Sequence, residues 1–380
     1  MKSSVVRVPF VDLKFQHQPI KKDIDRAVNS LIERGDFILG KAVAEFETAF
    51  ARACNVKYGV GVASGTSAIA LGLQACGIAR GDEVLVPANT FIASVIGIIQ
   101  AGATPILVDC ELDTALIDLD AAAKAVTPQT KAILPVHLYG QMVSPQKLLE
   151  FARSHNLFIF EDAAQAHLAT RESYYAGSVG KAAAFSFYPS KNLGALGNGG
   201  MVVTNDEAVA QKVRSLRNYG APKKYFHVEL GTNSRLDTLQ AAILHLKLPY
   251  LPDWNQMRNL AATMYDRFFQ ESSFLEIEPI RNYSDRGHVY HLYVVRLPES
   301  SSDTREQLQA NLATAGIQTG IHYPIPCHLQ PAFHYLGYQQ GDFPVAEALS
   351  QQILSLPIFP GITPEQVKLV CQQLAEKIKM

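Results

Sequence analysis

The stretch that decides the fold is residues 157–167, which read LFIFEDAAQAH. Its first four residues form a continuous apolar run, and two carboxylates and an amide follow. Six further short apolar runs occur between residues 58 and 206, and helix-like stretches separate most of them. Continuous apolar strands with helices between them are typical of a parallel sheet covered on both faces. Residues 58–206 therefore predict an α/β fold with a mostly parallel, seven-stranded sheet between helices.

The expected strands are residues 58–63, 83–87, 105–109, 132–137, 157–161, 182–187 and 201–204, and the expected helices include 66–76, 91–101 and 145–155. Glycines and polar residues gather just after the strands. In open α/β sheets, ligands bind at that carboxyl edge.

The pattern changes after residue 206. Residues 236–246 have helical spacing, and Pro249, Pro252 and Trp254 then mark a plausible boundary. The remainder mixes helices at 257–269, at 304–315 and after Pro364 with a strand at 291–296. We expect a large domain with an N-terminal arm at residues 1–250 and a smaller C-terminal α+β domain at 251–380.

The composition excludes several classes of function. The chain of 380 residues has a formal net charge of −1, and no basic stripe or helix-turn-helix pattern supports nucleic-acid binding. The most apolar stretch, residues 91–110, is interrupted by polar residues, glycine and proline, so no membrane span is expected. Five cysteines without a Cys-x-x-Cys pair argue against disulfides and a thiolate metal site, and suit a reducing cytoplasm.

Lys191 lies in the segment 185–194, which reads FSFYPSKNLG. An ordinary lysine is a protonated, inactive ammonium at neutral pH, and it becomes a nucleophile when it is desolvated or converted to an imine. The preceding apolar run can bury its end, and the glycines at 194, 197, 199 and 200 allow the backbone to approach a ligand closely. The alternative is an ordinary surface lysine.

Asp162 ends the apolar run of residues 157–160. A carboxylate at the tip of a buried strand is costly unless it meets a positive partner, and a pyridinium nitrogen is such a partner. The alternative is a helix N-cap, where Asp is favoured. His167 either contacts a ring system or packs in the core, and the sequence leaves both open.

Residues 64–67, which read SGTS, follow a strand and open a helix. Backbone N–H groups at such a position hold phosphate groups. Ser186 is a second phosphate candidate. Phe91 follows another strand end, where an aromatic ring either stacks on a ligand or belongs to the core. An amine, a carboxylate and an anion cradle, each at a strand end, are together what pyridoxal phosphate needs.

The chain resembles the DegT/StrS-type, fold-type-I, pyridoxal-phosphate-dependent sugar aminotransferases over nearly its whole length, from residue 8 to residue 360. The most specific matches are residues 161–167 and 186–191, together with 231–236 (GTNSRL) and 322–328 (HYPIPCH). The resemblance implies a homodimer with shared active sites.

The resemblance also implies roles for the matching residues. Lys191 would form the internal aldimine and act as the general base, while Asp162 would pair with the ring nitrogen. The other expected cofactor contacts are Gly65, Thr66 and Ser186 on the phosphate, Phe91 on the ring, Gln165 on the 3-hydroxyl, and Asn233 on the phosphate of the neighbouring subunit. Tyr188, His322 and Tyr323 would lie beside the sugar.

The function that follows is amino transfer from L-glutamate to a keto group of a nucleotide-linked deoxyhexose. Residues 191–197 look most like the branch that acts on C-3, and C-4 is the alternative position. Two residues depart from the family pattern: Asn198 replaces an acidic residue, and Leu168 replaces the Gly that usually follows His167. The competing interpretations are a non-enzymatic regulator or sensor on the same fold, an aminotransferase for another small ketone, and a pyridoxamine-dependent sugar dehydratase, which would carry His at position 191.

Overall fold

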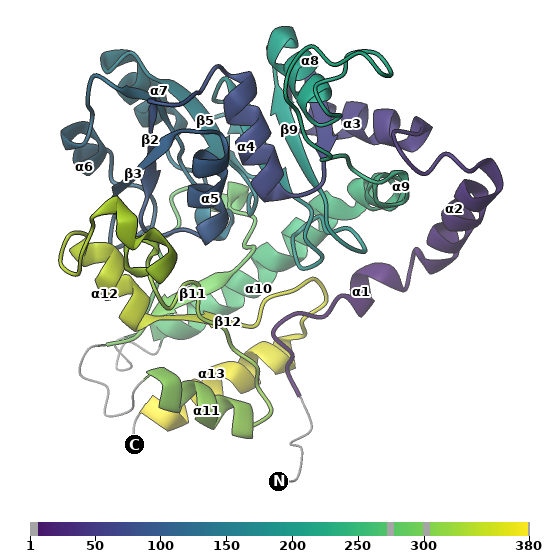
Figure 1. Cartoon of the computed structure of the whole chain (residues 1–380). Coiled ribbons are helices and arrows are strands. Elements are labelled where there is room, and N and C mark those ends of the chain that lie inside the picture. Colours follow the sequence, from purple (N-terminus) through teal and green to yellow (C-terminus); the bar gives the residue numbers. More distant parts are fainter. Residues whose placement is uncertain (1–6, 272–276, 299–304, 379–380) are drawn as a thin grey trace.

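The structure is a computed structural model, and it describes residues 7–271, 277–298 and 305–378 (Figure 1). Its main feature is a seven-stranded sheet in the order β1-β9-β8-β5-β4-β2-β3. These strands are β1 (Tyr58–Val62), β2 (Glu83–Pro87), β3 (Thr104–Val108), β4 (Thr130–Ile133), β5 (Phe158–Asp162), β8 (Ala182–Ser186) and β9 (Gly200–Thr204). The two pairings that involve β9 are antiparallel and the other four are parallel. The predicted α/β fold is confirmed.

Helices cover both faces of this sheet (Figure 1). They are α3 (Lys41–Ala53), α4 (Gly65–Ala75), α5 (Ile92–Gln100), α6 (Leu119–Lys124), α7 (Pro145–Ser154), α8 (Glu207–Leu216) and α9 (Thr238–Lys247). Neighbouring residues of β8 show how the faces divide, because side chains alternate along a strand. Phe185 packs edge-on against Phe50 of α3, with ring centroids 5.0 Å apart, whereas Ser186 approaches Gly65 of α4 on the other side.

The chain ends pack around a second, smaller sheet. The long helix α10 (Leu251–Glu271) leads to a three-stranded antiparallel sheet of β10 (Glu278–Pro279), β11 (Tyr293–Arg296) and β12 (Ile353–Leu356). The helices α11 (Arg305–Thr314), α12 (Pro344–Gln352) and α13 (Pro364–Ile378) complete this region, and a separate apolar cluster forms its core. At the other end, α1 (Lys14–His17) and α2 (Lys21–Arg34) form an arm that extends from the body (Figure 1). A two-stranded hairpin, β6 (Thr170–Arg171) and β7 (Tyr174–Tyr175), follows His167.

Two expectations about the C-terminal part need correction. Pro249 lies in the short 3-10 helix Leu248–Tyr250 that separates α9 from α10, as expected of a break, but α10 begins at Leu251 and not at residue 257. Pro252 lies in the first turn of α10, where the missing N–H costs nothing. The strand expected at 291–296 begins only at Tyr293, so His291 belongs to the preceding loop. Residue 304, expected to begin a helix, lies outside the described residues, and the helix is described from Arg305. The division into domains at residue 250 stays a prediction.

Candidate active site

A cavity of about 330 Å³ opens at the carboxyl edge of the large sheet. Ten of the eleven predicted site residues line it: Gly65, Thr66, Phe91, Asp162, Gln165, Ser186, Tyr188, Lys191, His322 and Tyr323. They come from strand ends and loops far apart in the sequence, because parallel strands deliver their carboxyl ends to one edge. A larger hollow of about 590 Å³, which runs from Leu112 to Arg296, contains none of them.

Lys191 lies in a tight loop between β8 and β9. Its backbone N–H donates to the Tyr188 carbonyl over 2.8 Å, and Ala195 N donates to the Phe187 carbonyl over 2.8 Å. Gly194 is needed here, since a Cβ at this position would lie 2.2 Å from the Pro189 carbonyl oxygen. Burial lowers the pKa of the Lys191 amine to about 8, and the nearby Asp162 acts in the opposite direction. The uncharged, nucleophilic fraction of this amine near neutral pH is therefore much larger than that of an ordinary lysine.

Asp162 is the last residue of β5 and is buried. The Ser94 hydroxyl donates to its Oδ2 over 2.7 Å, and the Ala164 N–H donates to its Oδ1 over 3.1 Å. Burial raises the pKa of this carboxyl, while Ser94, Ala164 and Lys191 lower it. A buried carboxylate with two neutral donors lacks a full countercharge, and a protonated ring nitrogen would supply one.

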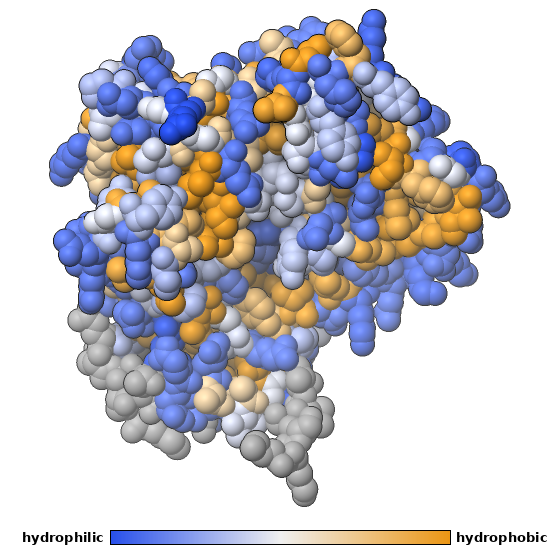
Figure 2. Space-filling model, viewed as in Figure 1, coloured by the Kyte–Doolittle hydropathy of each residue, from blue (hydrophilic) through white to orange (hydrophobic). Residues whose placement is uncertain are grey.

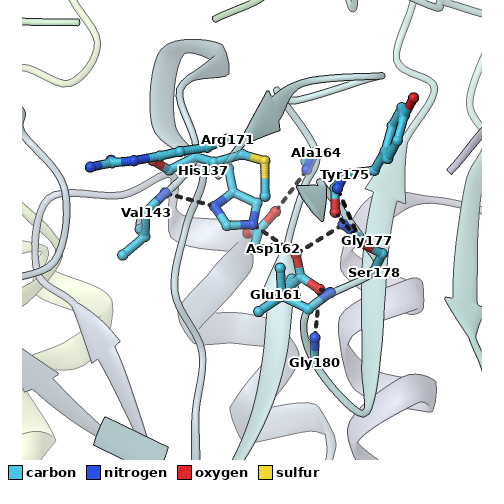
Figure 3. Close-up of polar contacts among 12 residues, drawn as sticks. His137, Val143, Glu161, Asp162, Ala164, Arg171, Tyr175, Gly177, Ser178 and Gly180 are labelled. Atoms are coloured by element: carbon cyan, nitrogen blue, oxygen red, sulfur yellow. Dashed lines mark hydrogen bonds and ion pairs between the residues drawn. The ribbon is translucent and has the colours of Figure 1, made fainter. Parts of the chain in front are cut away.

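Glu161 and Asp162 are adjacent carboxylates with different surroundings (Figure 3). Glu161 accepts backbone N–H groups from Gly177, Val179 and Gly180 over 2.8–2.9 Å. Its Oε2 also lies 2.9 Å from His137 Nε2, and both side chains are fully buried. Because Val143 N donates to His137 Nδ1, Nε2 carries the proton and donates to Glu161. Glu161 thus anchors the loop at 177–180, whereas Asp162 faces the cavity.

The N-terminus of α4 forms an anion cradle. Ser64 caps the helix, with its hydroxyl accepting the Ser67 N–H over 3.1 Å. The first-turn N–H groups of Gly65 and Thr66 have no partner within the helix and lie at its positive end. A Cβ on Gly65 would lie 2.7 Å from Ser186 Cβ, so glycine lets the helix approach the end of β8. Both candidate phosphate contacts, the helix N-terminus and Ser186, therefore share one wall.

Aromatic and amide groups form the opposite wall. The Phe91 and Tyr323 rings lie 5.5 Å apart, and Phe91 is 53% exposed beside the cavity. Gln165 accepts the Tyr139 N–H at its oxygen over 2.6 Å and donates from Nε2 to the Tyr323 hydroxyl over 3.1 Å. This fixes the orientation of the Gln165 amide, since only one flip satisfies both bonds, and leaves one N–H for a ligand.

Two residues singled out from the sequence lie elsewhere. Asn233 lines a different hollow, beside Ser67 and Gln74, and its Oδ1 accepts from Arg235 over 2.8 Å. His167 packs against Phe185 and Phe187, with ring centroids 5.4 and 5.8 Å away. Of the two interpretations left open for His167, the structure supports packing.

The cavity fits pyridoxal phosphate. An anion cradle, an unsatisfied buried carboxylate and an amine of lowered pKa face one space, with an aromatic ring at its rim. These are the groups that bind the cofactor's phosphate, ring nitrogen and aldehyde carbon.

Comparison with known proteins agrees. The model of the DegT/DnrJ/EryC1/StrS aminotransferase family matches residues 18–375. The chain belongs to this family. This aminotransferase is 45% identical to the dTDP-3-amino-3,6-dideoxy-alpha-D-galactopyranose transaminase of Aneurinibacillus thermoaerophilus, over 96% of the chain and 98% of that protein. It is also 42% identical to a protein of Geobacillus stearothermophilus named as a pleiotropic regulatory protein, over 98% of each chain.

Solved structures give the same result. The crystal structure of S. venezuelae DesV in complex with a ketimine intermediate superposes with a TM-score of 0.93 at 41% identity, covering 98% of this chain and 99% of that one. The predictions of a fold-type-I aminotransferase that depends on pyridoxal phosphate are confirmed. In the described part of the chain, no helix combines the length and apolar character needed to cross a membrane.

The sequence interpretation missed several residues of the site. Ser94 holds Asp162 from α5, and the only sequence signal for it is its position one turn into a helix that follows a strand end. His137 follows a predicted strand end, yet nothing in the sequence pairs it with Glu161. His291 lines the cavity although it was predicted only as part of a strand.

The two departures from the family pattern differ in kind. Leu168 has a left-handed backbone, with φ of 63°, and this explains why glycine is usual at that position. Asn198 is exposed and lines the cavity, so its replacement of an acidic side chain changes the charge that a ligand meets.

Proposed function

We propose that this aminotransferase moves an amino group from L-glutamate to the C-3 keto group of a nucleotide-linked deoxyhexose, with C-4 as the alternative position. The observation that carries the proposal is that Lys191 and Asp162 line one cavity, which is also lined by neutral polar groups. The family assignment and the names of the relatives support a keto sugar as acceptor, and the segment 191–197 favours C-3.

Each proposed role follows from the local chemistry. When bound, the cofactor acts as an electron sink that acidifies the substrate's Cα–H bond. Asp162 would keep the ring nitrogen protonated, and the N–H groups of Gly65 and Thr66 with the Ser186 hydroxyl would hold the phosphate. Phe91 would stack on the ring and Gln165 would donate to its 3-hydroxyl.

Lys191 would carry the protons. Its amine has a pKa of about 8, so at neutral pH it can accept a proton from Cα and return one to the neighbouring carbon. Tyr188, His322 and Tyr323 would lie beside the sugar. His322 is oriented for this, since its Nδ1 lies 2.8 Å from the Ser355 hydroxyl.

A homodimer with shared active sites forms part of the proposal. Several large apolar side chains of the segment 225–230 are exposed, among them Tyr225 at 84% and Leu230 at 98%. Other exposed apolar residues, including Ile32 and Phe37, lie in α2 and in the loop after it. Figure 2 shows apolar surface on this arm. Exposed apolar surface of this kind is typical of a protein–protein interface. Asn233 is close in sequence to the segment 225–230, and it does not line the candidate active site of its own subunit.

A purely regulatory role is the competing hypothesis, and the name of one relative suggests it for that relative. A regulator would not need an amine of lowered pKa beside a buried carboxylate. The cytoplasmic location stays a prediction.

Two experiments test the function. The protein is loaded with pyridoxal phosphate, exposed to L-glutamate and separately to other amino acids, and followed by absorption. The pyridoxamine form is then offered nucleotide-linked 3-keto and 4-keto sugars, and the products are identified by mass spectrometry and NMR. We expect conversion by glutamate and a 3-amino sugar. If the pyridoxamine form reacts with neither the 3-keto nor the 4-keto sugar, the proposed acceptor is contradicted.

Mixing subunits tests the shared site. K191A and N233A should each be inactive, and a mixture refolded together should recover activity, because one site of each hybrid dimer then has both wild-type residues. If Asn233 served its own subunit, no site in the hybrid would be intact and the mixture would stay inactive.

A further inference from the structure

His291 lines the cavity but has no part in the chemistry described above. It lies in the loop before β11, two residues ahead of Tyr293. Its Nδ1 is closed off from solvent and has no hydrogen-bond partner, and its Nε2 makes no hydrogen bond among the described residues. The side chain is only partly buried, so its accessible surface lies on the cavity side. Of the two ring nitrogens, only Nε2 can meet a ligand.

The groups that shift the pKa of His291 are all positive or neutral. Burial lowers the pKa of its imidazole well below the usual value, and Lys191, Arg258, His322 and His167 add to the effect. The Arg258 guanidinium is held close by, where it donates to the Tyr290 and Ile358 carbonyls over 3.0 Å each. No carboxylate contributes to the shift. The ring is therefore neutral at physiological pH, with its proton on one nitrogen.

The neighbouring polar groups of this wall already have partners. His322 bonds Ser355 through Nδ1, and the Tyr323 hydroxyl accepts from Gln165. Nothing in the described protein fixes His291 in this way. A ligand that bonds to a neutral polar side chain without a partner gains binding free energy, because the side chain is otherwise left unsatisfied at the cavity wall.

We propose that His291 carries its proton on Nε2 and is a substrate-binding residue that donates a hydrogen bond from Nε2 to a hydroxyl or keto oxygen of the amino acceptor. A neutral imidazole matches a neutral sugar oxygen, whereas the two carboxylates of L-glutamate call for a cation. The residue therefore discriminates between the two substrates that use the cavity in turn. This inference rests on the proposed function, because it requires a polyhydroxylated acceptor.

The two half-reactions separate the effects. In H291F the ring shape is kept and the donor is lost, while H291Q retains an N–H near the position of Nε2. We expect L-glutamate to convert H291F from the pyridoxal to the pyridoxamine form at a rate within about threefold of wild type. Its apparent affinity for the keto sugar should fall about tenfold, which corresponds to one lost hydrogen bond. H291Q should recover most of that loss.

A binding measurement gives a second readout. Calorimetric titration of the pyridoxal form with the amino-sugar product should show the same tenfold loss in H291F and recovery in H291Q. The cofactor absorption band and the circular dichroism spectrum should match wild type in both variants. If H291F fails this check it is replaced by H291N, whose shorter amide cannot reach the position of Nε2 and should show the same loss.

The outcomes are distinguishable. An equal loss in both half-reactions would show that His291 positions the cofactor or the loop, and no loss in either would show that it does not touch substrate; both results overturn the inference. Wild-type protein that reacts with L-glutamate but ignores every keto sugar would overturn the proposed acceptor, and the assignment of His291 with it.

Discussion

Two lysines, the partly buried Lys191 and the fully buried Lys247, have the same shifted acidity but different surroundings. Burial lowers the pKa of each to about 8. Lys191 faces a cavity and a carboxylate, Asp162. Lys247 ends α9 with no carboxylate partner among the described residues; it donates to the Gly194 carbonyl and lies 3.1 Å from His17 Nε2. A lowered pKa therefore does not identify a catalytic lysine. The access of the amine to a cavity does.

Lys247 also contacts the loop that carries Lys191. Gly194, which Lys247 holds, is three residues after Lys191. Lys247 thus ties the arm at His17 to the loop of the active site. The Lys247 ammonium also lies 5.8 Å from the centroid of the Trp254 ring, which compensates part of the charge that burial leaves unhydrated.

Removing the amine of Lys191 should have the largest effect. In K191A we expect turnover to fall by more than about 10³-fold, since a general base alone contributes about 10²–10⁴-fold. The fold should be unaffected, because no hydrogen bond of the described structure depends on Nζ. Steady-state kinetics and thermal unfolding check both expectations. Residual turnover within tenfold of wild type would remove Lys191 from the chemistry.

Replacing Asp162, the carboxylate that Lys191 has nearby and Lys247 lacks, should have the second-largest effect. D162N keeps the shape but cannot hold the ring nitrogen protonated, and turnover should fall by at least about 10²-fold. S94A removes one of its two donors and should cost less. Rates of the glutamate half-reaction for the pair check this order. Equal rates for D162N and wild type would contradict the role of the carboxylate.

Lys247 should matter far less for the reaction. In K247M we expect turnover to remain within about tenfold, because Nζ does not reach the cavity and Gln240 still binds the loop at Leu196 through two hydrogen bonds. A loss that matched K191A, measured on correctly folded protein, would show that the loop depends on this one contact.

The smallest effect is the pH dependence that Lys247 contributes to the free energy of unfolding. The folded pKa of Lys247 is about 8 and the unfolded value is near 10.5, so the unfolded state binds more protons between these pH values. The Lys247 contribution to stability should therefore rise with pH in this window, by up to about 1.4 kcal/mol per pH unit. Below pH 8 both states are protonated and the slope vanishes. Urea unfolding of wild type and K247M measures the difference, and identical slopes would contradict the assignment.

The sequence predicted the sheet and most of the cavity wall because both depend on local patterns. Apolar runs mark strands, and strand ends meet at one edge, so Asp162, Ser186 and Lys191 were found together. The contacts of Lys247 could not be predicted in this way. It lies 230 residues from His17 and 53 from Gly194, and only the packing of α9 against the arm and the loop brings these groups together.

Other residues were missed for related reasons. Asp162 was predicted as a site residue, but the role of Glu161 was not, because its partners at 177–180 are brought to it only by the folded loop. His291 was predicted as a strand residue because it directly precedes the apolar and aromatic run that forms β11. Pro252 was taken as a break because proline interrupts helices except in the first turn, where it lies here.

The most direct test of the central claim, that Lys191 and its cavity perform a transamination, is the visible spectrum of the protein with pyridoxal phosphate before and after L-glutamate, with K191A and K247M in parallel. Wild type and K247M should show a yellow band that bleaches to the pyridoxamine form, and K191A should lack the lysine-linked band. A band in K191A, or a wild-type band indifferent to every amino acid, would contradict the claim.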